Sequence, residues 1–135
     1  MKHVLIMEDN ALLANDWRGV FELNGHKVTL THNGDDAIAH LEATEFDLVI
    51  TDLFVPNAKG GLHVIGKLMT MKARMPPTIA VTGERRYTDD PKEKNYFLRQ
   101  TKKLGVSATI EKPFAPAELL LMADEFWSRE DKKLS

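Results

Sequence analysis

Short apolar runs alternate along the chain with longer stretches in which apolar residues recur at helical spacing. Runs of four or five residues bounded by polar or turn-forming positions are typical of buried strands. The predicted strands are His3–Met7, Lys27–Thr31, Asp47–Thr51, Thr78–Thr82 and Ala108–Glu111. Strands that alternate with helices form βαβ units, so the pattern predicts a parallel sheet covered by helices on both faces.

The helical stretches have identifiable starts and ends. Leu13, Trp17 and Phe21 lie on one helical face, and Gly25 follows as the residue expected just past the helix end. The other marker sets are Ala37, Ile38 and Leu41; Leu62, Ile65, Leu68 and Met69; Asp90, Pro91 and Glu93 at a helix start, with Gly105 at its end; and Leu119, Met122, Ala123, Phe126 and Trp127 after Pro116. Both tryptophans fall on apolar stripes, which favours core packing for each.

Length and composition limit the class of protein. The 135 residues suit one domain, and we expect it to span residues 1–129, with residues 130–135 as a polar tail or linker stub. A net charge of −2 provides no global field to attract nucleic acid or an anionic membrane surface. The chain lacks cysteine, and Glu8 interrupts the N-terminal apolar run far short of a signal peptide or membrane span. We therefore expect a cytoplasmic domain without nucleic-acid or membrane partners.

Polar residues whose side chains can bind ligands or take part in a reaction stand at the carboxyl ends of the predicted strands. They are Glu8 and Asp9 after the first strand, Asp52 after the third, Thr82 at the end of the fourth and Lys112 after the fifth. In an open parallel sheet, ligands bind beyond these ends, at the switch point of the winding. In the order 2-1-3-4-5, the first and third strands flank that point, so Glu8, Asp9 and Asp52 are expected to converge.

Converging carboxylates repel one another unless their pKa values rise or a cation binds. Oxygen ligands without nearby His or Cys favour a hard ion such as Mg²⁺. A neighbouring lysine and a hydroxyl group would supply the positive charge and the hydrogen bond that a phosphoryl group requires. The combination predicts phosphate chemistry, with an aspartate as candidate nucleophile.

Each residue also has a simpler explanation when it is taken singly. Asp9 or Asn10 could cap the first helix, and Asp52 could cap the turn that contains Pro56 and Gly60. Lys112 could be a solvated surface residue. The site is predicted from the joint occurrence of these residues at the ends of four strands.

The pattern resembles the receiver domain of two-component response regulators over nearly the whole chain. The matching stretches are "VLIMEDN", "DLVITDLFVPNAKGG", "IAVTG" and "IEKPF". The resemblance implies a doubly wound α/β fold, a flavodoxin-like three-layer sandwich with five parallel strands in the order 2-1-3-4-5. It implies a signalling domain that is not an enzyme acting on other substrates. Such a domain takes a phosphoryl group from a sensor histidine kinase or histidine phosphotransfer protein and then changes its protein contacts.

The resemblance also assigns the metal and the phosphoacceptor. It implies that Asp52 accepts the phosphoryl group. It implies that Asp9, Asp52 and the backbone carbonyl of Phe54 hold Mg²⁺, while Glu8 contributes through water.

The remaining site residues are assigned to the phosphoryl group in the same way. Lys112 would pair with its oxygens, Thr82 would hydrogen-bond one of them, and Gly83 would leave room for it to enter. The peptide bond before Pro113 is usually cis in the family.

Three departures from the family pattern affect regulation. Thr109 stands where many receivers have an aromatic residue, which argues against the usual aromatic switch coupled to Thr82. Phe54 is bulkier than the polar residues often found there, and we expect it to shield the phosphoryl group from water. The segment 84–103 is longer than in most receivers and is rich in Lys and Arg; it is either a solvated surface or part of a partner-docking region over residues 84–112.

Other functions compete with this interpretation. A Mg²⁺-dependent phosphohydrolase with an aspartyl-phosphate intermediate is the main alternative, although "EDN" lacks the Asp-x-Asp spacing after the first strand. A flavodoxin-type flavin module would need a Ser/Thr/Gly-rich loop after that strand. The intact acid set argues against a receiver that serves only as a constitutive adaptor.

Overall fold

The computed structural model describes residues 1–53, 61–83, 99 and 102–134. The elements in this part are β1 (His3–Met7), α1 (Ala11–Leu23), β2 (Lys27–Thr31), α2 (Gly34–Ala43), β3 (Leu48–Asp52), α3 (Gly61–Met69), the 3₁₀ turn η1 (Lys72–Arg74), β4 (Thr78–Thr82), β5 (Ala108–Glu111) and α5 (Pro116–Leu134). The predicted helix start at Asp90 lies outside the described residues, so that helix stays a prediction.

The sheet is parallel throughout, with strand order β2-β1-β3-β4-β5. This order and the α/β architecture confirm the predicted fold class. Four strands have the predicted bounds. β3 begins and ends one residue later than predicted, because Asp52 pairs with Val81 and the amide of Leu53 still donates to the Val81 carbonyl at 2.9 Å. Asp52 is therefore the last residue of the strand.

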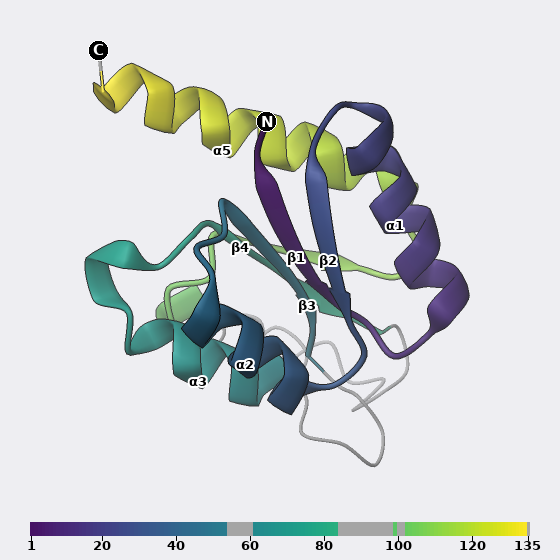
Figure 1. Ribbon diagram of the computed structural model, residues 1–135, viewed down its shortest axis with the longest axis horizontal. Coiled ribbons are helices and arrows are strands. Elements are labelled where there is room, and N and C mark those ends of the chain that lie inside the picture. Colours follow the sequence, from purple (N-terminus) through teal and green to yellow (C-terminus); the bar gives the residue numbers. More distant parts are fainter. Residues whose placement is uncertain (54–60, 84–98, 100–101, 135) are drawn as a thin grey trace.

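Helices cover both faces of the sheet, with α1 and α5 on one side and α2 and α3 on the other (Figure 1). The alternation of strand side chains divides the core in the same way. Val4 and Ile6 pack in the cluster on the α1/α5 side, whereas Leu5 and Met7 pack with α2 and α3. All four side chains are fully buried. The continuous apolar run of β1 thus serves two hydrophobic layers, as expected for a central parallel strand.

Two glycines follow helical segments in the left-handed region that L residues rarely adopt. Gly25 has φ +84° and its amide donates to the Glu22 carbonyl at 3.0 Å, which confirms the predicted end of α1. Gly105 has φ +95° and donates to the Lys102 carbonyl at 3.1 Å. Both backbone positions therefore favour glycine, because a side chain there would strain the backbone.

The last helix is longer than the sequence pattern indicated. α5 continues to Leu134, through the residues predicted to form a polar tail. Its C-terminal part, yellow in Figure 1, extends past the packed body of the domain, and residues 128–132 are exposed. Good helix formers and an exposed pair between Glu125 and Arg129, four residues apart, allow a polar helix to continue without a core contact. The division at residue 129 stays a prediction.

No helix within the described ranges has both the length and the apolar character needed to span a membrane.

Candidate phosphoacceptor and metal site

The residues that follow β1 leave Asp9 available for a ligand. Asn10, not Asp9, caps α1: its side-chain oxygen accepts from the amides of Leu12 and Leu13 at 3.0 and 3.1 Å. An N-cap residue satisfies helix amides that have no partner within the helix. Asp9 is exposed, and the simple capping role considered for it belongs to its neighbour.

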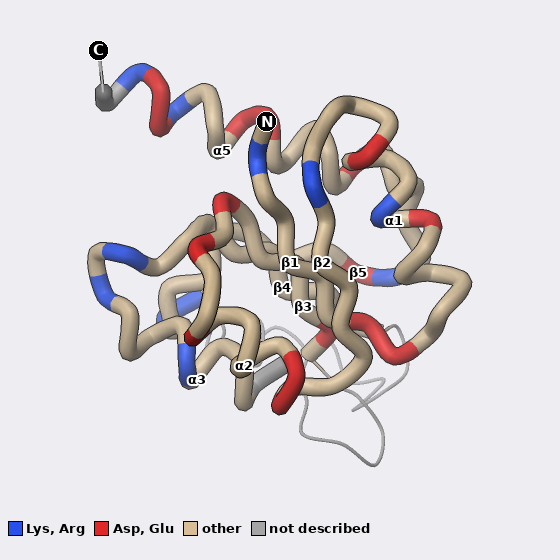
Figure 2. The backbone as a smooth tube through the Cα atoms, in the orientation of Figure 1, with Lys and Arg blue, Asp and Glu red and all other residues tan. Residues whose placement is uncertain are grey.

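The three predicted carboxylates converge. Glu8, Asp9 and Asp52 each offer a ligand oxygen, and these oxygens lie within 4.8 Å of one another. Glu8 and Asp52 are fully buried, because one follows a central strand and the other ends its neighbour. Figure 2 shows the acidic turn between β1 and α1 at the edge of the sheet where the strands have their carboxyl ends.

Lys112 reaches this cluster from the turn after β5. Its Nζ donates to Asp52 Oδ2 at 3.0 Å and also to Glu8 Oε1. The side chain is only 17% exposed, so the ion pairs are largely removed from water. The next peptide bond, Lys112–Pro113, is cis, as the family resemblance implied. Lys112 is thus not a solvated surface lysine.

The cluster changes the protonation of Glu8. Burial raises the pKa of Glu8 to about 7; its hydrogen bond with the Asp9 carboxyl group and the negative charge of Asp52 act in the same direction, while Lys112 opposes them. A buried carboxyl group beside other acids favours its neutral form. The sequence argument expected this outcome when several acids share a site without a bound cation.

Thr82 contributes a hydroxyl group with unused hydrogen-bonding capacity. It ends β4, one position beyond Val81, which pairs with Asp52. Thr82 is fully buried, and its Oγ1 has no hydrogen-bond partner among the described residues. A buried hydroxyl group without a partner costs free energy, so its position is consistent with a ligand that would complete it. Gly83 follows at the partly exposed rim.

The donor set fits a hard divalent cation. The three grouped side chains supply only carboxylate oxygens, the ligands that Mg²⁺ prefers, and one of them is exposed at the entrance. Phe54, whose carbonyl was the fourth predicted ligand, lies outside the described residues. So do Pro56 and Gly60 of the turn that Asp52 was considered to cap.

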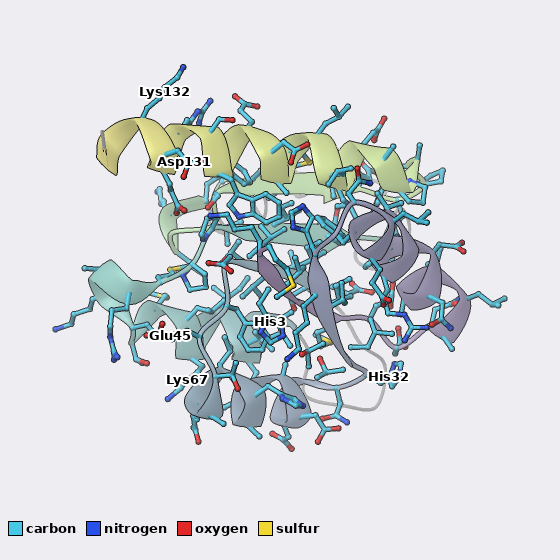
Figure 3. All side chains as sticks on the ribbon, turned by 45° about the horizontal axis from the view of Figure 1, so that its top comes forward. His3, His32, Glu45, Lys67, Asp131 and Lys132 are labelled. Atoms are coloured by element: carbon cyan, nitrogen blue, oxygen red, sulfur yellow. The ribbon has the colours of Figure 1, made fainter. Side chains whose placement is uncertain are left out.

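Two contacts around the cluster were missed by the sequence argument. The Lys112 Nζ lies 5.7 Å from the centroid of the Trp17 ring, on the α1/α5 side of the sheet. At the β2 end, the ring nitrogen Nδ1 of His32 lies 2.9 Å from the Glu8 carbonyl oxygen. Figure 3 shows His32 at the outer edge of the domain. Helical periodicity identified Trp17 as a core residue, but no sequence signal pairs it with a lysine 95 positions away.

A comparison with known protein families identifies the family of this chain. The profile of the response regulator receiver domain matches residues 4–124, which is most of the chain. The chain belongs to the response regulator receiver family. The resemblance inferred from the four sequence stretches is therefore confirmed, and so is the role of the domain in two-component signalling.

A known response regulator is similar over nearly the whole of this chain. The response regulator SaeR of Staphylococcus aureus is 30% identical over 132 residues, which cover 98% of this chain and 53% of SaeR. The chain thus spans about half the length of this relative.

Solved structures share the fold. The receiver domain of Francisella response regulator 1452 matches with a TM-score of 0.74 and 22% identity, over 96% of this chain and 99% of that one. A CheY-like receiver domain protein from Methanospirillum hungatei gives a TM-score of 0.77 and 24% identity, over 98% of each chain. At such identities the likeness shows the fold, and the roles of single residues rest on the site geometry.

Proposed function

We propose that this receiver domain takes a phosphoryl group onto Asp52 from the phosphohistidine of a sensor histidine kinase or histidine phosphotransfer protein. The observation that carries the proposal is the convergence of Glu8, Asp9 and Asp52, whose ligand oxygens lie within 4.8 Å of one another. Asp52 would act as nucleophile, and it would also hold a cation together with Asp9 and Glu8.

The chemistry requires few groups. A carboxylate oxygen of Asp52 attacks phosphorus, an O–P bond forms, and the P–N bond to the donor imidazole breaks with its electron pair leaving on nitrogen. The departing imidazole nitrogen takes up a proton from solvent water. Lys112, already 3.0 Å from Asp52 Oδ2, supplies positive charge for the phosphoryl oxygens, and the Thr82 hydroxyl supplies a hydrogen bond.

Mg²⁺ would be held by Asp9 and Asp52, with Glu8 and the Phe54 carbonyl completing the set. When bound, the ion neutralises charge on the phosphoryl oxygens. Glu8 is more basic than an ordinary carboxylate because it is buried. Loss of its proton would accompany metal binding.

The output is a change of protein contacts through residues 84–112. Part of this region, 84–98 and 100–101, lies outside the described residues. Thr109 lies on β5 and is partly buried, opposite Ala80 of β4. A threonine there has no aromatic ring to rotate, so we propose that Thr82 links phosphorylation to this region without an aromatic switch at position 109. Phosphoryl uptake and loss then form a signalling cycle and do not amount to turnover of external substrates.

Acetyl phosphate tests the proposal directly. Incubation with Mg²⁺ followed by intact mass measurement should show the gain of one phosphoryl group. The gain should be lost in Asp52→Ala and kept in Asp16→Asn, a matched change of an exposed acid on α1. An unchanged gain in Asp52→Ala would contradict the assignment. Sustained hydrolysis of small phosphate esters would instead favour the phosphohydrolase.

A further inference from the structure

The position of the Lys112 ammonium group depends on more than its two ion pairs. Lysine has a flexible four-carbon stem, and an ammonium group is a point charge without a fixed orientation. Phosphoryl transfer depends on the placement of charge, and an error of 1 Å in a catalytic group is costly. Glu8 and Asp52 attract the ammonium from the acid side. A contact on another side is needed to define its position.

Trp17 provides that contact. The Lys112 Nζ lies over the Trp17 ring, 5.7 Å from the centroid, within the range of cation–π attraction. Trp17 is 1% exposed and packs in the core between the sheet and α5, so the ring is held rigidly. The face of an indole ring is the strongest of the aromatic partners for a cation.

The same ring also contacts the chain segment that carries the lysine. Trp17 and Phe114 stack with ring centroids 5.5 Å apart and an interplanar angle of 26°. Phe114 follows Lys112 by two residues, after the cis bond at Pro113. Trp17 therefore touches the lysine's backbone segment through Phe114 and its ammonium group directly.

We propose that Trp17 is a positioning residue for phosphoryl transfer, which holds the Lys112 ammonium group against Asp52 through its ring face. This inference rests on the proposed role of Asp52 and Lys112. Trp17 does not touch the phosphoryl group. It acts through Lys112, and it links α1, which begins just after the acids Glu8 and Asp9, to the turn after β5.

Core packing is the competing explanation, and Trp127 is a matched control for it. Trp127 is also buried, at 5% exposure, and Lys2 Nζ lies 6.0 Å from its ring centroid. Its indole nitrogen donates to the Asp47 carbonyl at 3.0 Å, near the amino end of β3 and away from the acids. A tryptophan that only fills the core should behave like Trp127 in both stability and phosphorylation.

The first experiment compares two shortened side chains at position 17. Trp17→Phe keeps a ring face, whereas Trp17→Leu removes it, and both leave unfilled space. With acetyl phosphate and saturating Mg²⁺, we expect Trp17→Leu to lower the phosphorylation rate about tenfold and Trp17→Phe about twofold. Trp127→Phe and Trp127→Leu should lower the thermal midpoint without this ring-dependent loss of rate. Rates that follow the thermal midpoints across all four variants would overturn the proposal.

The second experiment measures the contact without phosphorylation. The chain has two tryptophans, so Trp127→Phe leaves Trp17 as the sole indole fluorophore. In the Trp127→Phe variant, measured in metal-free buffer, the further change Lys112→Met should shift the Trp17 emission maximum, because it removes a charge that lies over the ring. Lys103→Met, which removes an exposed lysine, should leave the emission maximum unchanged. Identical spectra for the Lys112 variant and its parent would overturn the contact.

The two experiments also separate this proposal from the function on which it rests. If the wild-type protein gains no phosphoryl group under any condition, the assignment of Asp52 fails, while the fluorescence result still decides whether the ammonium lies on the ring. If the wild-type protein is phosphorylated on Asp52 and Trp17→Leu reacts at the wild-type rate, the function stands and the positioning role of Trp17 fails.

Discussion

At the scale of single residues, the site is defined by groups that the fold leaves in unusual states. Glu8 is a buried acid with a pKa near 7, and Thr82 is a buried hydroxyl group without a partner among the described residues. Both states cost free energy in the protein without ligands. A cation and a phosphoryl group are the ligands that would relieve them. The burial of the Glu8 carboxyl group and of the Thr82 hydroxyl group would therefore support binding of these ligands.

The raised pKa of Glu8 predicts how stability depends on pH. Glu8 binds its proton more tightly in the folded chain than at its ordinary value of 4.5, so its contribution to stability is fully present below that pH. The contribution is lost as the pH rises through about 7. In metal-free buffer, Glu8→Gln should flatten the fall in the free energy of unfolding between these pH values. Urea titrations at several pH values measure this free energy. Glu118→Gln, at the exposed start of α5, is the control.

The opposite slope would contradict this assignment. If stability rose with pH over that interval in the wild-type protein and Glu8→Gln removed the rise, Glu8 would be stabilised in its charged form. The Lys112 ion pair would then outweigh burial in setting its pKa.

At the scale of elements, the residue that caps α1 differs from the residues that form the candidate metal site. Asn10 satisfies two amides of the first turn, and its own amide lies 3.3 Å from Glu8 Oε2 as a donor. The turn between β1 and α1 is therefore fixed by Asn10, and Asp9 can bind a ligand without loss of the cap. In this turn, Asn10 caps the helix, and Asp9 is available to the metal site.

Removal of the cap should destabilise the domain without removing the carboxylates. Asn10→Ala should lower the free energy of unfolding by about 1 kcal/mol, the typical loss for an N-cap side chain. Asn33→Ala is the control, because the Asn33 side chain caps α2 through the amide of Asp36 and has no hydrogen bond to the three acids among the described residues. Chemical denaturation measures both losses.

Asn10→Ala should also weaken Mg²⁺ binding, because Asn10 orders the turn that carries Asp9. Asn33→Ala should leave Mg²⁺ binding unchanged. Equal Mg²⁺ affinity in the two variants would show that the turn after β1 holds its conformation without the cap.

At the scale of the whole molecule, metal binding and folding are linked. Glu8 and Asp9 come from the turn after β1, and Asp52 comes from the end of β3, so the three acids lie together only in the folded sheet. A ligand that binds only the folded state stabilises it by RT ln(1 + [L]/Kd), about 2.7 kcal/mol at a hundredfold excess over Kd. Mg²⁺ should therefore raise the thermal midpoint of the protein in a concentration-dependent manner.

Asp9→Asn should remove most of this rise, since Asp9 is exposed and its replacement disturbs no core contact. Asp16→Asn, a change of an exposed acid on α1, the helix that follows this turn, should keep the rise. Scanning calorimetry across a Mg²⁺ series measures the shift. An equal rise in Asp9→Asn and in the wild-type protein would place the cation elsewhere.

The sequence predicted much of this arrangement because its signals are local and periodic. The continuous apolar runs of the strands and the helical stripes indicate which segments form the core, and the acids stand at or directly after the carboxyl ends of β1 and β3. The parallel order then brings Glu8, Asp9 and Asp52 together. The one-residue shift of β3 escaped the pattern, since the pairing of Asp52 with Val81 depends on the register of a neighbouring strand.

The sequence by itself therefore determined the fold class, the two buried faces of the sheet and the identity of the clustered acids. The tertiary structure alone decided the contacts of Lys112 with Glu8 and Asp52, which lie 104 and 60 positions away in the chain. It also decided the protonation of Glu8 and the position of the Trp17 ring against Lys112. The structure likewise shows that Thr82 Oγ1 has no hydrogen-bond partner among the described residues. The physical reason is that these properties depend on side-chain conformation, burial and charge across distant segments, whereas sequence patterns report only the nearest turns of the chain.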